Sequence, residues 1–201
     1  MMRITLIPLG IGNLGSITAS VRRLGHQLTV WEPGTDIGAT DWVILPGVGS
    51  MVSAASSFEA HALRKILTKR YRSRQPILGV CLGMQIWFGE SEEGGEGLRW
   101  LAGSVAALNA PISPHIGWNQ LEVDPNAPSW LRSYDGECFY FVHGYAVKPL
   151  ETTVIAARTC YHGLVFPSML RNGPLVGMQF HPELSSDQGE SLMSDIFRYG
   201  P

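Results

Sequence analysis

Short apolar runs alternate with helical patterns along the first 90 residues, and this alternation restricts the possible folds more than any other feature. An apolar run in ITLIPL leads through a glycine-rich turn into the helical pattern SITASVRRLG, which Gly25 ends. Strands that are connected by helices run parallel in one sheet, with the helices packed on both faces. The same order repeats through the apolar runs at 27–31, 42–45 and 77–80 and the helical spacing at 51–71.

The second half of the chain changes character. Short strand candidates follow one another there, separated by Pro, Asn, Gly and Asp, until a helical pattern begins at Asp187. We therefore predict an α/β fold with an open, mixed, mainly parallel sheet, helices on both faces, and antiparallel strands added in the second half. We expect one domain over residues 1–201, since no repeat or linker is visible. The strand candidates lie at 104–109, 116–123, 137–145, 152–159 and 175–180.

Composition excludes several classes of protein. A net charge of −2 gives no electrostatic reason to expect nucleic acid or an anionic membrane as a partner. No apolar run approaches the roughly 20 residues that span a bilayer, and MMRITLIPLGIGN lacks a signal-peptide pattern. Three widely spaced cysteines without a CxxC pair argue against a disulfide framework and a zinc site. We expect a cytoplasmic protein without a metal.

The turn after the first apolar run carries a dinucleotide-binding pattern. Gly10, Gly12 and Gly15 match GxGxxG between a strand and a helix, and Glu32 lies where a ribose-binding acid is expected. The rest of the chain shows no second half of such a fold. An NAD-type oxidoreductase is therefore one alternative, and the simpler interpretation is that these glycines only shape the turn.

Cys81 stands where an apolar strand pattern stops and a helical pattern begins. Gly79 and Gly83 flank it in GVCLG, which permits a sharp bend. A helix N-terminus favours a thiolate, and a strand-to-helix corner is the geometry with which hydrolases expose a nucleophile. The N–H of Leu82 could face an oxyanion formed on a substrate carbonyl. A buried, unreactive cysteine is the alternative interpretation.

A candidate base follows the last strand pattern in LVGMQFHPELSS. A thiol nucleophile needs a base and the base needs an orienting group, and His181 with Glu183 across Pro182 supplies such a pair. We interpret His26, His61 and His162 as structural. His115 and His143 are harder to place and are candidates to line a pocket.

Six segments together carry a family resemblance. The chain resembles the class I (triad-type) glutamine amidotransferases and, within them, the glutaminase subunits of imidazole glycerol phosphate synthase. GVCLGMQ and QFHPE are typical of the class, whereas PHIGWN and FYFVHGY are typical of the subfamily. The matching segments are GNLGS (12–16), LPGVGS (45–50), CLGMQ (81–85), PHIGWN (114–119), FYFVHGY (139–145) and QFHPELS (179–185).

The resemblance implies a cysteine-dependent hydrolysis of glutamine without a cofactor. Cys81 would attack the substrate amide, His181 would move protons, and Glu183 would orient the imidazole. The oxyanions would be met by N–H groups of Leu82 and of the loop at Val48 and Gly49. The positions that match substrate contacts of the family are Gln85, Glu93, His143, Gly144 and Tyr145.

The resemblance also implies a partner that consumes the ammonia. In the family this is a (β/α)8-barrel cyclase, which forms a heterodimer with the glutaminase for histidine synthesis. Positions matching the interface are Asn13, Trp118, Asn119, Tyr140 and Leu184.

Two departures from the subfamily pattern leave the ammonia acceptor open. Leu184 replaces a usual lysine and Gly144 a usual Ser or Thr. As a further difference, the opening IPLGIGN lacks the usual aspartate and aromatic residue. A paralogous glutaminase that supplies a different amidotransfer, such as nucleotide-sugar modification, is therefore an alternative. A binding module that has lost the chemistry is another, and the intact Cys81, His181 and Glu183 argue against it.

Overall fold

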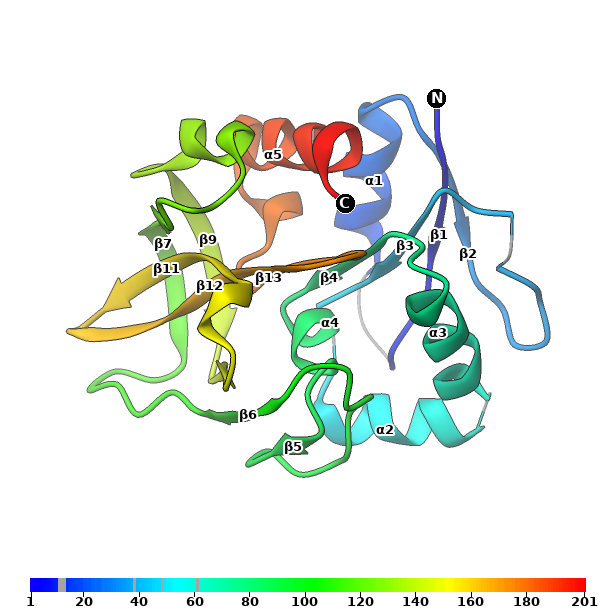
Figure 1. The fold of residues 1–201 in the computed structure, drawn as a ribbon, viewed down its shortest axis with the longest axis horizontal. Helices are drawn as coiled ribbons and strands as arrows, with labels where there is room; N and C mark the ends of the chain where they lie inside the picture. Colours follow the sequence, from blue (N-terminus) through cyan, green and yellow to red (C-terminus); the bar gives the residue numbers. More distant parts are fainter. Residues whose placement is uncertain (11–13, 38, 48, 61) are drawn as a thin grey trace.

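A mixed sheet forms the centre of the molecule (Figure 1). The computed structural model describes residues 1–10, 14–37, 39–47, 49–60 and 62–201. Within these residues the main sheet has eight strands in the order β2-β1-β3-β4-β13-β12-β11-β8. The first five in this order are parallel to one another, as the strand–helix alternation predicts. They are β1 (Arg3–Leu6), β2 (Gln27–Val30), β3 (Trp42–Leu45), β4 (Ile77–Val80) and β13 (Leu175–Met178).

Antiparallel strands extend the sheet on one side and form two smaller sheets. The predicted addition of antiparallel strands in the second half of the chain is confirmed. In the main sheet these are β12 (Leu164–Asn172), β11 (Ile155–Tyr161) and β8 (Glu122–Val123). The smaller sheets join β10 (Tyr145–Pro149), β6 (Gly103–Ala107) and β5 (Glu90–Ser91), and β7 (His115–Gln120) with β9 (Cys138–His143).

Helices cover both faces of the parallel strands, as predicted (Figure 1). Neighbouring residues of a strand point to opposite faces, so each strand contributes to two cores. On β3, Ile44 packs in the core under α1 and α5, whereas Val43 packs in the core under α2 and α3. The helices are α1 (Gly15–Arg23), α2 (Met51–Ala60), α3 (Leu63–Arg72), the short α4 (Leu82–Gln85) and α5 (Ser186–Tyr199), with 3-10 turns at η1 (Ser129–Tyr134), η2 (Thr152–Val154) and η3 (Pro182–Leu184).

The helical pattern at 51–71 forms two helices instead of one. Ala62, just before α3, has a φ of 54°, in the left-handed region. A helix cannot continue through that conformation, so the chain changes direction between α2 and α3. Apolar periodicity alone does not reveal such a break, because both helices bury their apolar residues in the same core.

One strand of the second half, β12, was not expected from the sequence. It contains Pro167, which has no N–H to donate to a sheet. Pro167 pairs with Arg158 of β11, directly beside a register shift in the β11–β12 pairing that lies between Ala157 and Arg158. The missing N–H is tolerated at this irregularity, where the regular ladder of hydrogen bonds is interrupted.

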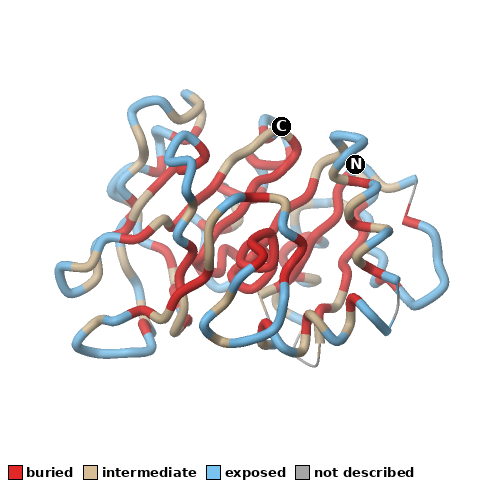
Figure 2. The backbone as a smooth tube through the Cα atoms, turned by 60° about the horizontal axis from the view of Figure 1, so that its bottom comes forward, coloured by how far each residue is buried: buried red, intermediate tan, exposed pale blue. Residues whose placement is uncertain are grey.

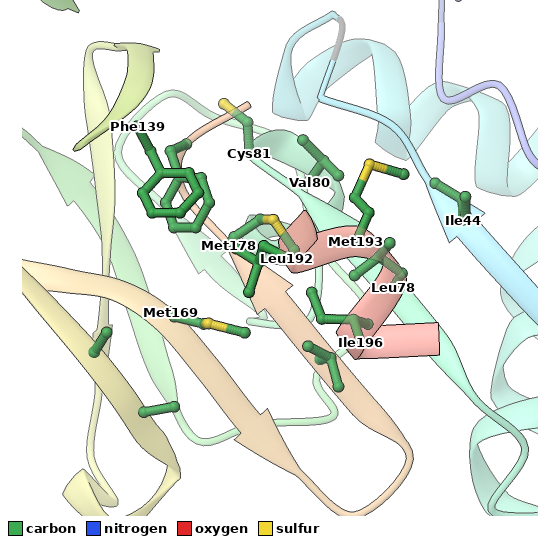
Figure 3. Packing of buried hydrophobic residues seen from close by; sticks show 14 of the residues in the cluster. Ile44, Leu78, Val80, Cys81, Phe139, Met169, Met178, Leu192, Met193 and Ile196 are labelled. Carbon is green, nitrogen blue, oxygen red and sulfur yellow. The ribbon is translucent and has the colours of Figure 1, made fainter. Parts of the chain in front are cut away.

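Helix α5 packs across β4 and β13 and supports the end of the sheet that carries Cys81 (Figure 3). Leu192, Met193 and Ile196 are fully buried against the strand residues. The residues of the central strands are buried, whereas exposed residues are concentrated in the outer loops (Figure 2). Among the described residues, none of the helices is both long enough and apolar enough to cross a membrane.

Two glycines on adjacent strands make room for a buried indole on the other face. Gly79 of β4 pairs with Gly177 of β13, and Trp87 lies against both. A Cβ at either position would lie 2.6 Å from the Trp87 ring, which is far inside van der Waals contact. The β4–β13 pair can therefore approach Trp87 only because both residues lack a side chain.

We expect Gly177→Ala to lower the free energy of unfolding by about 1–3 kcal/mol, because the fully buried Trp87 ring cannot move away. The matched control is Gly144→Ala. A Cβ there would come no closer than 3.9 Å to another atom, so its effect should be within about 0.5 kcal/mol. Urea unfolding of the two variants checks this, and equal stabilities would contradict the packing described.

Candidate active site

Cys81 lies at the corner between β4 and α4, as the sequence predicts. Its φ of 47° and ψ of −107° are unfavourable for a residue with a side chain and cost of order 1–3 kcal/mol. Hydrogen bonds hold this conformation. The Cys81 N–H donates to the Met178 carbonyl of β13 at 2.7 Å, and the Cys81 carbonyl accepts the N–H groups of Met84 and Gln85. Sheet and helix are thus joined at the candidate nucleophile.

Gly47 in the loop after β3 lies against both candidate catalytic side chains. A Cβ at Gly47 would lie 2.7 Å from Cε1 of His181 and 2.8 Å from Cβ of Cys81. Only a residue without a side chain fits there. The glycine loop, the thiol and the imidazole therefore meet at one point, although they come from three distant segments of the chain.

His181 and Glu183 form a buried pair. Nδ1 of His181 and Oε1 of Glu183 are 2.8 Å apart, and less than a tenth of either side chain is exposed. The His181 N–H donates to the Tyr140 carbonyl, and the His181 carbonyl accepts the Ser185 hydroxyl, which fixes the backbone on both sides of the ring. Because a carboxylate only accepts, Nδ1 carries a proton and Nε2 is the nitrogen available for proton transfer.

The charged form of His181 is favoured despite its burial. Burial lowers the pKa of His181, but the interaction with Cys81 and the hydrogen bond to Glu183 raise it by a larger amount. The pKa of His181 therefore lies above its ordinary value. Nε2 of His181 and Oε2 of Glu183 are buried and have no hydrogen bond of regular geometry to the described residues. The arrangement can therefore hold a proton on the imidazole beside the Cys81 sulfur.

Gln179 contacts the Cys81 sulfur, which sequence reasoning missed. It is fully buried, and its Nε2 lies 3.4 Å from Sγ. It stands directly after β13 and two residues before His181, and the strand alternation of β13, if continued, places both side chains on one side. This spacing was the available signal in QFHPE.

Gln85 is buried behind the nucleophile instead of opening freely into a pocket. Its Nε2 donates to the Tyr145 carbonyl at 2.9 Å and to Oε1 of Gln179 at 3.1 Å. Both N–H bonds are thus used within the protein. Only Oε1 of Gln85 remains to accept a hydrogen bond from a ligand.

His143 and His115 form a second buried pair, with Nε2 of His143 3.2 Å from Nδ1 of His115. Nδ1 of His143 lies 2.9 Å from the Tyr145 carbonyl and must carry the proton, because a carbonyl only accepts. Nε2 then accepts from His115. Burial lowers the pKa of both rings to about 4, so the pair is neutral at pH 7. Both ring nitrogens of His143 are thus hydrogen-bonded within the protein, and only its backbone groups remain to contact a ligand.

Glu93 and the glycine loop lie near the start of α2. Oε2 of Glu93 accepts the N–H of Met51 at 2.8 Å, which leaves Oε1 for a ligand. Gly49 has a φ of 104°, a conformation that favours glycine. Val48 of this loop lies outside the described residues.

The predicted interface residues divide between the two faces of the β7–β9 ribbon. Trp118 and Tyr140 pair across the strands on the exposed face, with Trp118 53% exposed. The Asn119 side chain lies on the other face and donates to the Cys160 carbonyl. Leu184 in η3 is exposed, and Asn13 lies outside the described residues.

The dinucleotide pattern has a packing explanation at Gly10. A Cβ there would lie 2.9 Å from the Ser53 hydroxyl of α2, so the glycine permits close packing of the turn on this helix. Gly12 lies outside the described residues. Within the described part of the chain, no group of three or more His, Cys, Asp or Glu side chains is placed to hold a metal ion.

Comparisons with known proteins agree on one family. The family model "Glutamine amidotransferase class-I" matches residues 6–198. The chain is 39% identical to "Imidazole glycerol phosphate synthase subunit HisH" of Moorella thermoacetica, covering 98% of this chain and 94% of the relative. It is 40% identical to the protein of the same name from Methanopyrus kandleri, with 97% of each chain covered.

Solved structures show the same fold at lower identity. "Structure of PurLQS from Thermotoga maritima" contains a chain with a TM-score of 0.79, 15% identity and 99% of each chain covered. "Crystal structure of glutamine amidotransferase" has a TM-score of 0.75 and 18% identity, covering 96% of this chain and 97% of the other. These likenesses confirm the predicted α/β architecture.

The neutral histidine pair predicts that stability falls in acid. His115 and His143 have folded pKa values of about 4, below the unfolded value near 6.5, so the unfolded chain binds more protons between these limits. The free energy of unfolding should therefore fall as the pH drops from 6.5 towards 4. In His115→Phe, the loss between pH 7 and pH 5 should be smaller by about 2 kcal/mol, because one titrating ring is gone.

Denaturant unfolding at the two pH values measures this difference. The matched control is Phe166→Leu, which changes a ring without a titratable group that packs against both histidines and should leave the pH dependence as in the wild type. If His115→Phe and wild type lose the same stability, the histidine pair is not the source.

Proposed function

Because the chain belongs to the class-I glutamine amidotransferase family, whose members hydrolyse glutamine with a cysteine nucleophile, we propose that Cys81 is that nucleophile and that His181 and Glu183 complete a catalytic triad. The observation that carries the proposal is the buried His181–Glu183 hydrogen bond of 2.8 Å beside Cys81, with Gly47 in contact distance of both reacting side chains. The family model spans nearly the whole chain, which supports one domain over residues 1–201.

The first half of the reaction forms a thioester. The Cys81 thiolate attacks the side-chain amide carbon of glutamine, and the carbonyl oxygen becomes an oxyanion. His181 gives its Nε2 proton to the leaving nitrogen, the C–N bond breaks, and ammonia departs. Glu183 keeps the imidazole oriented through Nδ1 while its charge changes.

The second half consumes water. His181 takes a proton from a water molecule, which attacks the thioester carbon and forms a second oxyanion. The C–S bond then breaks and releases the thiolate and glutamate with a protonated γ-carboxyl group, which loses its proton to solvent. The proton stays on His181, so the charge-separated pair is restored for the next cycle.

The oxyanions need N–H donors, and the corner at Cys81 offers one. The N–H of Leu82 belongs to the first turn of α4, where no intrahelical acceptor exists. We assign the second donor to the loop that includes Gly47, Val48 and Gly49, because Gly47 packs against the thiol and the imidazole. Removing one such donor typically costs about 2.7–4 kcal/mol of barrier, so the conformation of this loop controls the rate.

We assign the ammonium group of the substrate glutamine to side chains with free hydrogen-bonding capacity. Oε1 of Gln85 and Oε1 of Glu93 can accept from its ammonium group. The backbone at His143, Gly144 and Tyr145 borders the same region, since the Val142 carbonyl lies 4.0 Å from the Cys81 sulfur.

We propose histidine biosynthesis as the pathway and a (β/α)8-barrel cyclase as the partner. Two relatives that are 39% and 40% identical over nearly their full length carry the name of an imidazole glycerol phosphate synthase subunit, which favours this acceptor over another amidotransfer. A partner is also chemically required, because free ammonia at neutral pH becomes protonated and stops being a nucleophile. The three free cysteines fit a reducing cytoplasm.

An exposed apolar face beside the triad supports docking of that partner. The outward side chains of the β7–β9 ribbon include Ile116, Trp118, Tyr140 and Val142, and Tyr140 also accepts the His181 N–H through its carbonyl. Leu184, 42% exposed, follows directly after Glu183. With leucine in place of the usual lysine, this part of the contact is apolar, and the cyclase that fits it presents an uncharged surface there.

Replacing Glu183 should slow glutamine hydrolysis without abolishing it. In Glu183→Gln, the imidazole loses its oriented and charged partner, and we expect kcat to fall by about 10²- to 10⁴-fold. Cys81→Ala, which removes the nucleophile, should reduce activity to background. Ammonia release measured with coupled glutamate dehydrogenase checks both. Activity retained in Cys81→Ala would rule out the proposed nucleophile, and full activity in Glu183→Gln would rule out the orienting role.

Truncating the exposed tryptophan should weaken binding of the cyclase. We expect Trp118→Ala to cost about 2 kcal/mol of binding free energy, since exposed tryptophans are frequent hot spots. Tyr199→Ala is the matched control, because Tyr199 is also an exposed aromatic residue but lies far from Cys81. The neighbouring Gly200 packs against Trp42 at the start of β3, whereas Cys81 follows the end of β4. Titration calorimetry with the cyclase should separate the two variants. Equal affinities would mean that the partner docks elsewhere.

A further inference from the structure

A continuous series of buried hydrogen bonds connects the backbone of β10 to the Cys81 sulfur. The Tyr145 carbonyl accepts from Nε2 of Gln85, Oε1 of Gln179 accepts from the same nitrogen, and Nε2 of Gln179 points to Sγ. The three distances along this series are 2.9, 3.1 and 3.4 Å. Gln85 and Gln179 are 5% and 0% exposed, so water does not compete for these groups.

The order of donors and acceptors in this series is fixed from one end. A backbone carbonyl can only accept, so the Gln85 atom that faces Tyr145 is its nitrogen. That nitrogen has a second hydrogen, which requires an acceptor, and the amide oxygen of Gln179 supplies it. The Gln179 nitrogen must then face Cys81. The opposite orientation of Gln179 would place two donors against each other and direct its oxygen at the sulfur.

A donor directed at sulfur has a defined chemical effect. A thiolate is a stronger hydrogen-bond acceptor than a thiol, so an N–H donor favours the charged form. In a buried site the effect is larger than in water, because few other groups stabilise the charge. The same contact restricts the rotation of the Cys81 side chain and keeps Sγ on the side of His181.

We propose that Gln179 is a positioning residue that donates its amide N–H to the Cys81 thiolate, with Gln85 holding this amide in the donating orientation. The proposal rests on Cys81 being the nucleophile. It gives Gln85 a role besides any contact with substrate. Gln179 acts before glutamine binds, because its contacts involve the protein alone.

Alkylation of Cys81 by iodoacetamide at different pH values, without glutamine, tests the proposal. Mass spectrometry of the digested protein follows each cysteine separately, and the exposed Cys138 and Cys160 serve as internal references. In Gln179→Met, which keeps the shape and removes the donor, we expect the pH midpoint of Cys81 alkylation to rise by about one unit. The midpoints of Cys138 and Cys160 should stay unchanged.

Two further variants make the test specific. Gln85→Met leaves the Gln179 amide in place but unheld, and we expect a smaller rise in the same direction. Ser168→Ala is the matched control, because Ser168 is fully buried beside Gln179, accepts its backbone N–H and forms no side-chain hydrogen bond to the described residues. Ser168→Ala should leave the Cys81 midpoint as in the wild type.

An unchanged midpoint in folded Gln179→Met would overturn the proposal, even if glutamine hydrolysis falls. If that variant does not fold, Gln85→Met decides by the same criterion. A rise of the Cys81 midpoint supports the proposed donation from Gln179 to the thiolate, and an unchanged midpoint refutes it. Glutamine hydrolysis by wild type and Cys81→Ala is measured on the same preparations. Hydrolysis that requires Cys81, combined with an unchanged midpoint, refutes the role of Gln179 alone, whereas hydrolysis that persists in Cys81→Ala refutes the proposed function itself.

Discussion

The parallel pairing of β4 with β13 is the constraint on which the site depends. The last bond of this ladder, from the Cys81 N–H to the Met178 carbonyl, brings Cys81 beside Gln179, which is 98 residues away in the sequence. Both strands end at the same edge of the sheet, so both chain ends turn out of the sheet at the same level. The two strands can pack closely against the Trp87 indole because Gly79 and Gly177 have no side chains. Packing on one face thus sets the distance between the chemical groups at the edge.

Burial lowers the pKa of all three histidines near this edge, and their partners decide whether the final pKa lies below or above the ordinary value. His115 and His143 face each other and a carbonyl, so burial keeps both neutral. His181 faces a carboxylate and a thiol, and its pKa rises despite similar burial. The fold therefore separates two neutral, buried histidines from the one whose charged form is favoured, which is the proposed proton carrier. The committed side chains of Gln85 and His143 also show that much of the polar lining orients other groups before any substrate arrives.

Much of the fold was predictable, because it follows from local patterns. The alternation of strands and helices predicts the parallel half, and the corner at Cys81 follows from its flanking glycines. Features that depend on distant neighbours were missed. Strand β12 contains Pro167, which lies beside a register shift in the pairing with β11. The orientation of the Gln179 amide depends on its hydrogen bond with Gln85, and the side on which Asn119 lies depends on the register of β7 with β9. Neither relation can be inferred from the identity of a single residue.

The central claim is that Cys81 carries the glutamyl group during turnover. Acid quenching of the enzyme shortly after mixing with glutamine, followed by mass spectrometry of the digested protein, tests it most directly. The account predicts a glutamyl thioester on Cys81 that increases in Glu183→Gln, because a poorly oriented imidazole activates water less well for the second step. It also predicts no adduct on Cys138 or Cys160. Hydrolysis at the normal rate with no adduct on Cys81 at any time, or with an adduct on another cysteine, would contradict it.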